Sequence, residues 1–118
     1  MRRVVLNPCT RKRATMPNNP ANPPNGAYTS NCGNSGWSGS FTYTNGAIVY
    51  TRSDNPSTQY YANNTSQGNA MVFSITSGGN TIRFEGNYEA NGNKAQYVGT
   101  CNDNSPKNTQ DPWTATQE

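Results

Sequence analysis

The side chains that most often carry out acid–base and nucleophilic chemistry are scarce in this sequence. The chain has no histidine, which removes the commonest general base and metal ligand and the usual Ser-His and Cys-His nucleophile pairs. Glu85 and Glu89 share one face of a predicted strand, but they lie about 13 Å apart along it, beyond the roughly 5 to 9.5 Å of a glycosidase pair. With Arg83 they are better explained as a solvated charged stripe. We therefore predict a protein that is not an enzyme, with no catalytic residue, metal or cofactor.

Two adjacent tyrosines, followed by an Asn-rich stretch, are the best candidates for ligand binding. Tyrosine rings provide flat faces on which sugars and other ligands stack. On a regular strand neighbouring side chains point to opposite faces, so one of the two rings must point away from the core. We predict that Tyr60, Tyr61, Asn63 and Asn64 contact a glycan or a small molecule; the alternative is a plain half-exposed tyrosine. Residues 63–66 also contain two overlapping N-glycosylation sequons, which matter only where the source glycosylates its proteins.

Three cysteines, Cys9, Cys32 and Cys101, allow three different single disulfides with one thiol left over. We predict the pair Cys32 and Cys101, because it would join the start of the folded part to its end. In the chain-entropy model the closure of such a long loop stabilises a fold by about 4 kcal/mol. The alternative is that both are buried, reduced cysteines in a reducing compartment. With the disulfide, we expect an extracellular or cell-surface location.

Residues 1–35 differ in composition from the rest of the chain. The segment from Met16 to Gly26 is rich in proline and asparagine. We therefore predict that residues 1–35 are a disordered arm or linker outside the sheet. From residue 14 onward four basic residues against six acidic ones leave a net charge of −2, so nucleic acid is expected to bind only through the arm, if at all. The alternative is an incorrectly assigned start or a leader remnant. The basic residues of the arm are Arg2, Arg3, Arg11, Lys12 and Arg13.

The remaining residues, 36–118, have the pattern of one all-β domain. Hydrophobic residues make up only 31% of the chain, but seven Tyr, three Phe and two Trp argue for folding over disorder. No apolar run reaches the roughly 18 residues of a membrane span. Asn45-Gly46 is a strong hairpin signal, and apolar and polar side chains alternate in seven segments. These segments are residues 37–44, 48–50, 58–62, 70–76, 81–89, 95–102 and 113–117.

These segments predict a small antiparallel meander of about seven strands, closed as a barrel or folded as a sandwich. Three inward-facing glycines, Gly39, Gly86 and Gly99, each stand between two large residues. Glycine inside a strand indicates a sharp bend, or a ring that lies across the backbone. We therefore favour the barrel over the sandwich.

In Gly36-Trp37, in Phe84 to Tyr88 and in Trp113 the chain resembles the calycin group, the avidins and lipocalins, whose strands carry Gly-x-Trp and Gly-x-Tyr-like elements. The resemblance implies a small antiparallel calycin-like barrel. The sequence departs from it at Ser35, which stands in place of a lipocalin glycine. It also lacks a lipocalin-type C-terminal helix and evident partners for the tryptophans that stack on the avidin ligand.

Two functions remain open at this point. The first is a non-enzymatic extracellular or surface domain that binds a glycan or a small apolar ligand through its loops or barrel mouth. The second is a structural subunit of a fibre, pilus, phage tail or capsid, in which copies of the chain pair with one another. The size of the purified protein in solution separates the two.

Overall fold

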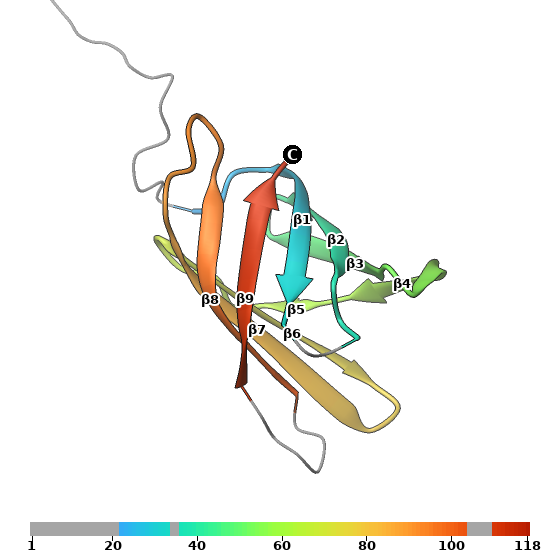
Figure 1. The fold of residues 1–118 in the computed structure, drawn as a ribbon. Helices are drawn as coiled ribbons and strands as arrows, with labels where there is room; N and C mark the ends of the chain where they lie inside the picture. The colour runs from blue at the N-terminus through green and yellow to red at the C-terminus, as the bar shows by residue number, and fades with distance from the viewer. Residues whose placement is uncertain (1–21, 34–35, 104–109) are drawn as a thin grey trace, which may run out of the picture.

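The computed structural model describes residues 22–33, 36–103 and 110–118, and this part of the chain is a single sheet without helices (Figure 1). The strands found there are β1 (Gly26–Cys32), β2 (Gly39–Thr44), β3 (Ala47–Arg52), β4 (Asn55–Tyr61), β5 (Asn63–Asn64), β6 (Ala70–Ser77), β7 (Asn80–Tyr88), β8 (Gln96–Asp103) and β9 (Gln110–Gln117). All neighbours pair antiparallel, in the order β4-β3-β2-β1-β9-β8-β7-β6-β5.

The two edges of this sheet are consecutive in the chain, and this is what curls it into a nearly closed barrel. Only Ala62 separates β4 from β5, so residues 55–65 run on as one stretch, which we call the seam strand. Its first part pairs with β3, as far as a 3.1 Å hydrogen bond from Ala62 N to Ile48 O. Its last part pairs with β6, where Thr65 N donates to Val72 O over 2.8 Å. The predicted all-β barrel is confirmed.

Aromatic rings fill the interior of the barrel. Phe41 stacks on Tyr28 with ring centroids 5.0 Å apart, and Phe73 stacks on Phe84 at 4.8 Å. The Trp113 ring lies 5.5 Å from that of Phe84. All five side chains are at most 2% exposed. Because rings occupy the centre of the barrel, a ligand would have to bind at its ends or on its outer surface.

The prediction that the sheet begins after residue 35 is wrong, because β1 pairs with both β2 and β9. Tyr28, Ser30 and Cys32 point inward and are buried. A serine in the middle of this inward row breaks the apolar period, which is why the alternation is not apparent in the sequence. With β1 and the short β5, the described residues form nine strands where about seven were predicted. The five basic residues of the predicted arm lie outside the described residues.

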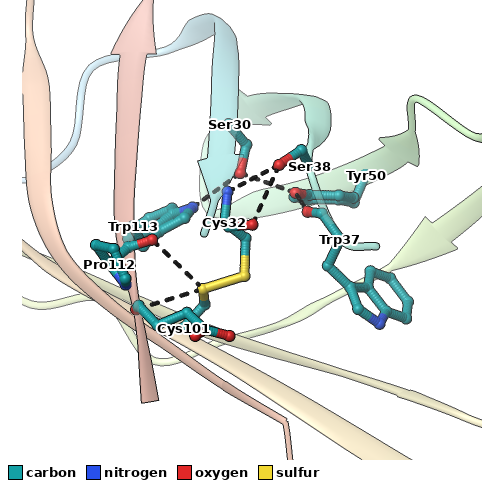
Figure 2. Close-up of a disulfide and its surroundings, with 9 residues drawn as sticks. Ser30, Cys32, Trp37, Ser38, Tyr50, Cys101, Pro112 and Trp113 are labelled. Carbon is teal, nitrogen blue, oxygen red and sulfur yellow. Dashed lines mark hydrogen bonds between the residues drawn. A yellow bond between two sulfur atoms is a disulfide. The ribbon is translucent and has the colours of Figure 1, made fainter. Parts of the chain in front are cut away.

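A disulfide joins Cys32 at the end of β1 to Cys101 of β8, with β9 between the two strands (Figure 2). The predicted pairing is confirmed. Beside it, Trp113 Nε1 donates to Ser30 Oγ over 2.8 Å, and the Tyr50 hydroxyl also bonds to Ser30 Oγ at 2.8 Å. The Tyr50 hydroxyl contacts the Trp37 carbonyl oxygen as well. Ser30 is buried in the core because its hydroxyl satisfies these two larger polar groups.

Two of the three inward glycines lie opposite one another, as register partners in β7 and β8. A Cβ on Gly86 would lie 3.1 Å from Cζ3 of Trp113, so the indole rests on this glycine. A Cβ on Gly99 would lie 1.9 Å from Glu85 O, which is too close for any side chain. The predicted ring across the backbone is therefore present at Gly86, and Gly99 allows close approach of the neighbouring strand.

Candidate functional site

The seam strand places the four predicted ligand-binding residues on opposite faces. Because side chains alternate along a strand, Tyr60 and Asn64 point into the barrel, and both are half-buried. Tyr61 and Asn63 point outward and are exposed. The structure therefore brings together only two of the four residues as a surface that another molecule can reach.

The two inward residues serve the fold. The Tyr60 ring packs edge-on against Trp37, with centroids 5.0 Å apart. The Asn64 side chain uses both of its amide hydrogens: Nδ2 donates to the Tyr43 hydroxyl at 3.2 Å and to Gly46 O at 2.9 Å. Its Oδ1 accepts from Ser66 N at 2.9 Å. Asn64 thus ties the seam strand to the β2–β3 hairpin.

The Tyr61 side chain is 73% exposed. Among the described residues, it is the one large hydrophobic side chain that is exposed to solvent. Its direct partner across the β3–β4 pair is Val49, whose side chain also points outward. Side chains of such a pair lie about 4.5–5.5 Å apart at Cβ, so Val49 borders the tyrosine ring. The Tyr61 hydroxyl donates to Gln59 Oε1 over 3.3 Å. The ring faces of Tyr61 are thereby presented to solvent beside an aliphatic neighbour.

An amide stands on each side of this ring, because Gln59 and Asn63 share its strand and its face. Each is two residues from Tyr61, about 6–7 Å along the strand. We call Gln59, Tyr61, Asn63 and Val49 the outer seam face. Sequence reasoning missed Gln59 and Val49. The alternation Gln59-x-Tyr61-x-Asn63 could have identified the glutamine, whereas the valine follows only from the pairing register.

The outer seam face continues into a shallow hollow of about 170 Å³ on the outside of β1 to β3. Val49 and Gln59 belong to both. The other residues that line the hollow are mostly small and uncharged. The exception is Glu118, whose carboxylate accepts a 3.0 Å hydrogen bond from the Thr29 hydroxyl. The lining residues are Ala27, Ser40, Phe41, Thr42, Val49, Thr51, Gln59 and Glu118.

Two further hollows lie at the ends of the barrel, where the lining side chains make contacts within the molecule. One of about 350 Å³ lies at the end of the barrel near Asn25, Tyr43 and Asn45, where Asn25 Nδ2 donates to Asn45 Oδ1 at 3.1 Å. One of about 180 Å³ at the opposite end includes Trp37, but the Arg52 guanidinium lies 4.6 Å above that ring. Both ends are thus engaged in contacts within the barrel.

A further hollow of the outer surface, about 240 Å³, lies across β7 and β8 and continues to Gln110. It contains no aromatic side chain. Its charged groups, Arg83 and Glu85, form an exposed ion pair of 3.2 Å. This matches the predicted charged stripe, in which Glu89 follows the end of β7.

Burial raises the pKa of three tyrosines inside the barrel. Removal from water raises the pKa of Tyr50 to about 12, and it raises the pKa of Tyr28 and of Tyr97 still further. These hydroxyls therefore stay protonated at neutral pH and act as hydrogen-bond groups. The Tyr97 hydroxyl is buried and finds no hydrogen-bond partner among the described residues.

Among the described residues no helix is long and apolar enough to cross a membrane. The chain was also compared with protein families, curated proteins and solved structures, and nothing matches it. The resemblance to the calycin group therefore remains confined to the short motifs quoted above.

Proposed function

We propose that the protein is a non-enzymatic glycan-binding domain that works outside the cell or on its surface, and that the outer seam face is its binding site. The observation that carries this proposal is the 73% exposure of Tyr61 between two outward amides. The ring contributes little to the packing of the barrel, so its faces are accessible to another molecule. Placed beside hydrogen-bonding groups, it has the composition of a sugar-binding surface.

The chemistry of a neutral sugar fits the surroundings of Tyr61. The C–H face of a pyranose would stack on the tyrosine ring, and its hydroxyls would exchange hydrogen bonds with Gln59 and Asn63, which can each donate and accept. Val49 would cover the sugar edge toward β3. The hollow beyond it is lined by the hydroxyls of Ser40, Thr42 and Thr51, which would serve a second sugar unit.

Two further features favour a neutral glycan over the other ligands considered. Aromatic rings of the described residues fill the interior of the barrel, so a small apolar molecule would have to displace them to enter it. The outer seam face carries no charged residue, so a strongly ionic polymer would gain little binding energy there.

The disulfide between Cys32 and Cys101 supports a location where thiols are oxidised.

Arrays of immobilised neutral and acidic oligosaccharides, probed with the unmodified full chain, test this proposal. We expect binding to neutral glycans that falls at least about tenfold, or about 1.4 kcal/mol, in Tyr61→Ala and persists in Tyr61→Phe. Asn87→Ala, an exposed outward position on β7, is the matched control and should bind as the parent does. Equal binding by the parent and Tyr61→Ala would exclude this site.

The alternative of a structural subunit has less support from the fold. A nearly closed barrel leaves little free strand edge for backbone pairing between copies. Light scattering of the purified protein tests this directly. We expect a small discrete species, and spontaneous growth into large uniform assemblies would favour the structural role.

A further inference from the structure

Two overlapping N-glycosylation sequons lie on the seam strand, and the structure separates them. Asn63-Asn64-Thr65 directs modification to Asn63, and Asn64-Thr65-Ser66 directs it to Asn64. Both asparagines are in β5, but they point to opposite faces of the sheet. In the folded protein Asn63 is exposed, whereas Asn64 is half-buried.

Asn64 cannot carry a glycan in this fold. An N-glycan replaces one hydrogen of the side-chain amide, and both hydrogens of Asn64 Nδ2 are donated, to the Tyr43 hydroxyl and to Gly46 O. A sugar at this nitrogen would also have to occupy the space between the seam strand and the β2–β3 hairpin. Modification of Asn64 and this local structure exclude one another.

Asn63 meets the opposite conditions. Its side chain is exposed on the outer face, and a chain attached there projects into solvent. Tyr61 precedes it by two residues on the same face, so the ring lies about 6–7 Å along the strand from the point of attachment. Tyr61, Asn63 and Thr65 thus form one outward row in which an aromatic ring stands beside the acceptor.

We propose that Asn63 is an N-glycan acceptor and that the first sugar of its glycan rests on the Tyr61 ring, which closes the outer seam face to other glycans. The acceptor assignment stands on the accessibility of Asn63, whereas the closure rests on the proposed function, because it uses the same contact between ring and sugar. Glycosylation would then switch the site from open to occupied, without any movement of the barrel.

The modification needs an oligosaccharyl diphosphate donor and the transferase that uses it. A bond forms between Asn63 Nδ2 and the anomeric carbon of the donor, and the bond from that carbon to the diphosphate oxygen breaks. The diphosphate leaves with the electron pair, and one proton leaves Nδ2. No oxidant or reductant takes part.

Secretion of the full chain from cultured animal cells, followed by mass measurement of the intact protein, tests the acceptor. We expect one glycan on the parent. It should disappear in Thr65→Ala, which removes the Asn63 sequon, and remain in Thr65→Ser and Ser66→Ala. A parent without a glycan, or a glycan that is lost in Ser66→Ala and kept in Thr65→Ala, would overturn the assignment.

The closure is tested by comparing the secreted protein with the unmodified protein. We expect at least about a tenfold loss of array binding in the glycosylated form, and nuclear Overhauser effects between the Tyr61 ring and the first sugar that vanish in Tyr61→Ala. Equal binding by both forms, or no ring–sugar contact, would overturn the closure. If neither form binds an array, the proposed function fails and the closure fails with it, whereas the assignment of Asn63 as the acceptor is decided by the mass measurement alone.

Discussion

The inner and outer faces of the seam strand carry the same kinds of side chain and do opposite things. Tyr60 packs on Trp37 inside the barrel, whereas Tyr61, the next residue, exposes 73% of its surface. The Asn64 side-chain amide donates hydrogen bonds to the β2–β3 hairpin, whereas Asn63 faces solvent. The comparison teaches that residue type does not assign a role in this chain; the pairing register of one strand does.

The inner face is part of a connected system, which the outer face is not. Around the disulfide, Ser30 joins Trp113 and Tyr50 by hydrogen bonds (Figure 2). The buried aromatic rings pack against one another throughout the barrel. Changes inside should therefore affect the stability of the whole molecule. Changes on the outer seam face should affect binding and leave stability almost unaltered.

The largest effect on stability is expected from Trp113→Ala. The change removes a fully buried indole and leaves the Ser30 hydroxyl without its N–H donor, so we expect a loss of about 5 kcal/mol, the upper end for such truncations. Urea unfolding measures it. Tyr61→Ala is the outer control and should stay within about 0.5 kcal/mol of the parent. Similar losses in both variants would contradict the contrast between the two faces.

Removal of the disulfide should be the next largest change. The double variant Cys32→Ala with Cys101→Ala should lose about 4 kcal/mol, because the bond closes a long loop in the unfolded chain. Unfolding of the parent with and without reductant gives an independent value. If reduction leaves the unfolding midpoint unchanged, the disulfide between β1 and β8 does not stabilise the fold.

The two asparagines of the seam strand sharpen the comparison further. Asn64→Ala removes three side-chain hydrogen bonds, with Tyr43, Gly46 and Ser66, and leaves the Gly46 carbonyl without this donor, so we expect a loss of about 1–3 kcal/mol. Asn63→Ala should change the unfolding free energy by no more than about 0.5 kcal/mol. Thermal unfolding of both variants compares them directly. A larger loss in Asn63→Ala would reverse the assignment of faces.

The smallest expected effect is a loss of stability at alkaline pH, which comes from the buried tyrosines. Burial raises the pKa of Tyr50 from 10.0 to about 12, and raises those of Tyr28 and Tyr97 also. A tyrosine that keeps its proton more firmly when folded contributes stability that is fully present below pH 10 and is lost as the pH rises through the folded pKa. Urea unfolding at a series of pH values from about 9 to about 12 measures this loss. Stability that does not change between pH 9 and pH 12 would contradict the burial of these hydroxyls.

Much of the fold can be predicted from the sequence where local signals agree. Asn45-Gly46 with alternating neighbours predicts the β2–β3 hairpin, and the inward row Ile82, Phe84, Gly86 and Tyr88 predicts β7. Strand β1 is not apparent, because Ser30 is buried by partners that lie 20 and 83 residues away. Only the tertiary structure shows that a polar residue belongs to its inward row.

The candidate site is less predictable for a related reason. The sequence shows that either Tyr60 or Tyr61 must point outward, but which of them does so depends on the pairing of the seam strand with β3. Val49 is brought beside Tyr61 by that same register. The hollow next to it combines residues of β1, β2, β3 and β4, and no local pattern brings these together.

Titration of the isotopically labelled, unmodified protein with the glycan selected on the arrays, followed by heteronuclear NMR, tests the central claim most directly. We expect shifts to concentrate at Gln59, Tyr61, Asn63 and Val49, with little change at Tyr60 or Asn64. Shifts that concentrate at either end of the barrel, or that leave Tyr61 unaffected, would show that the outer seam face is not the binding site.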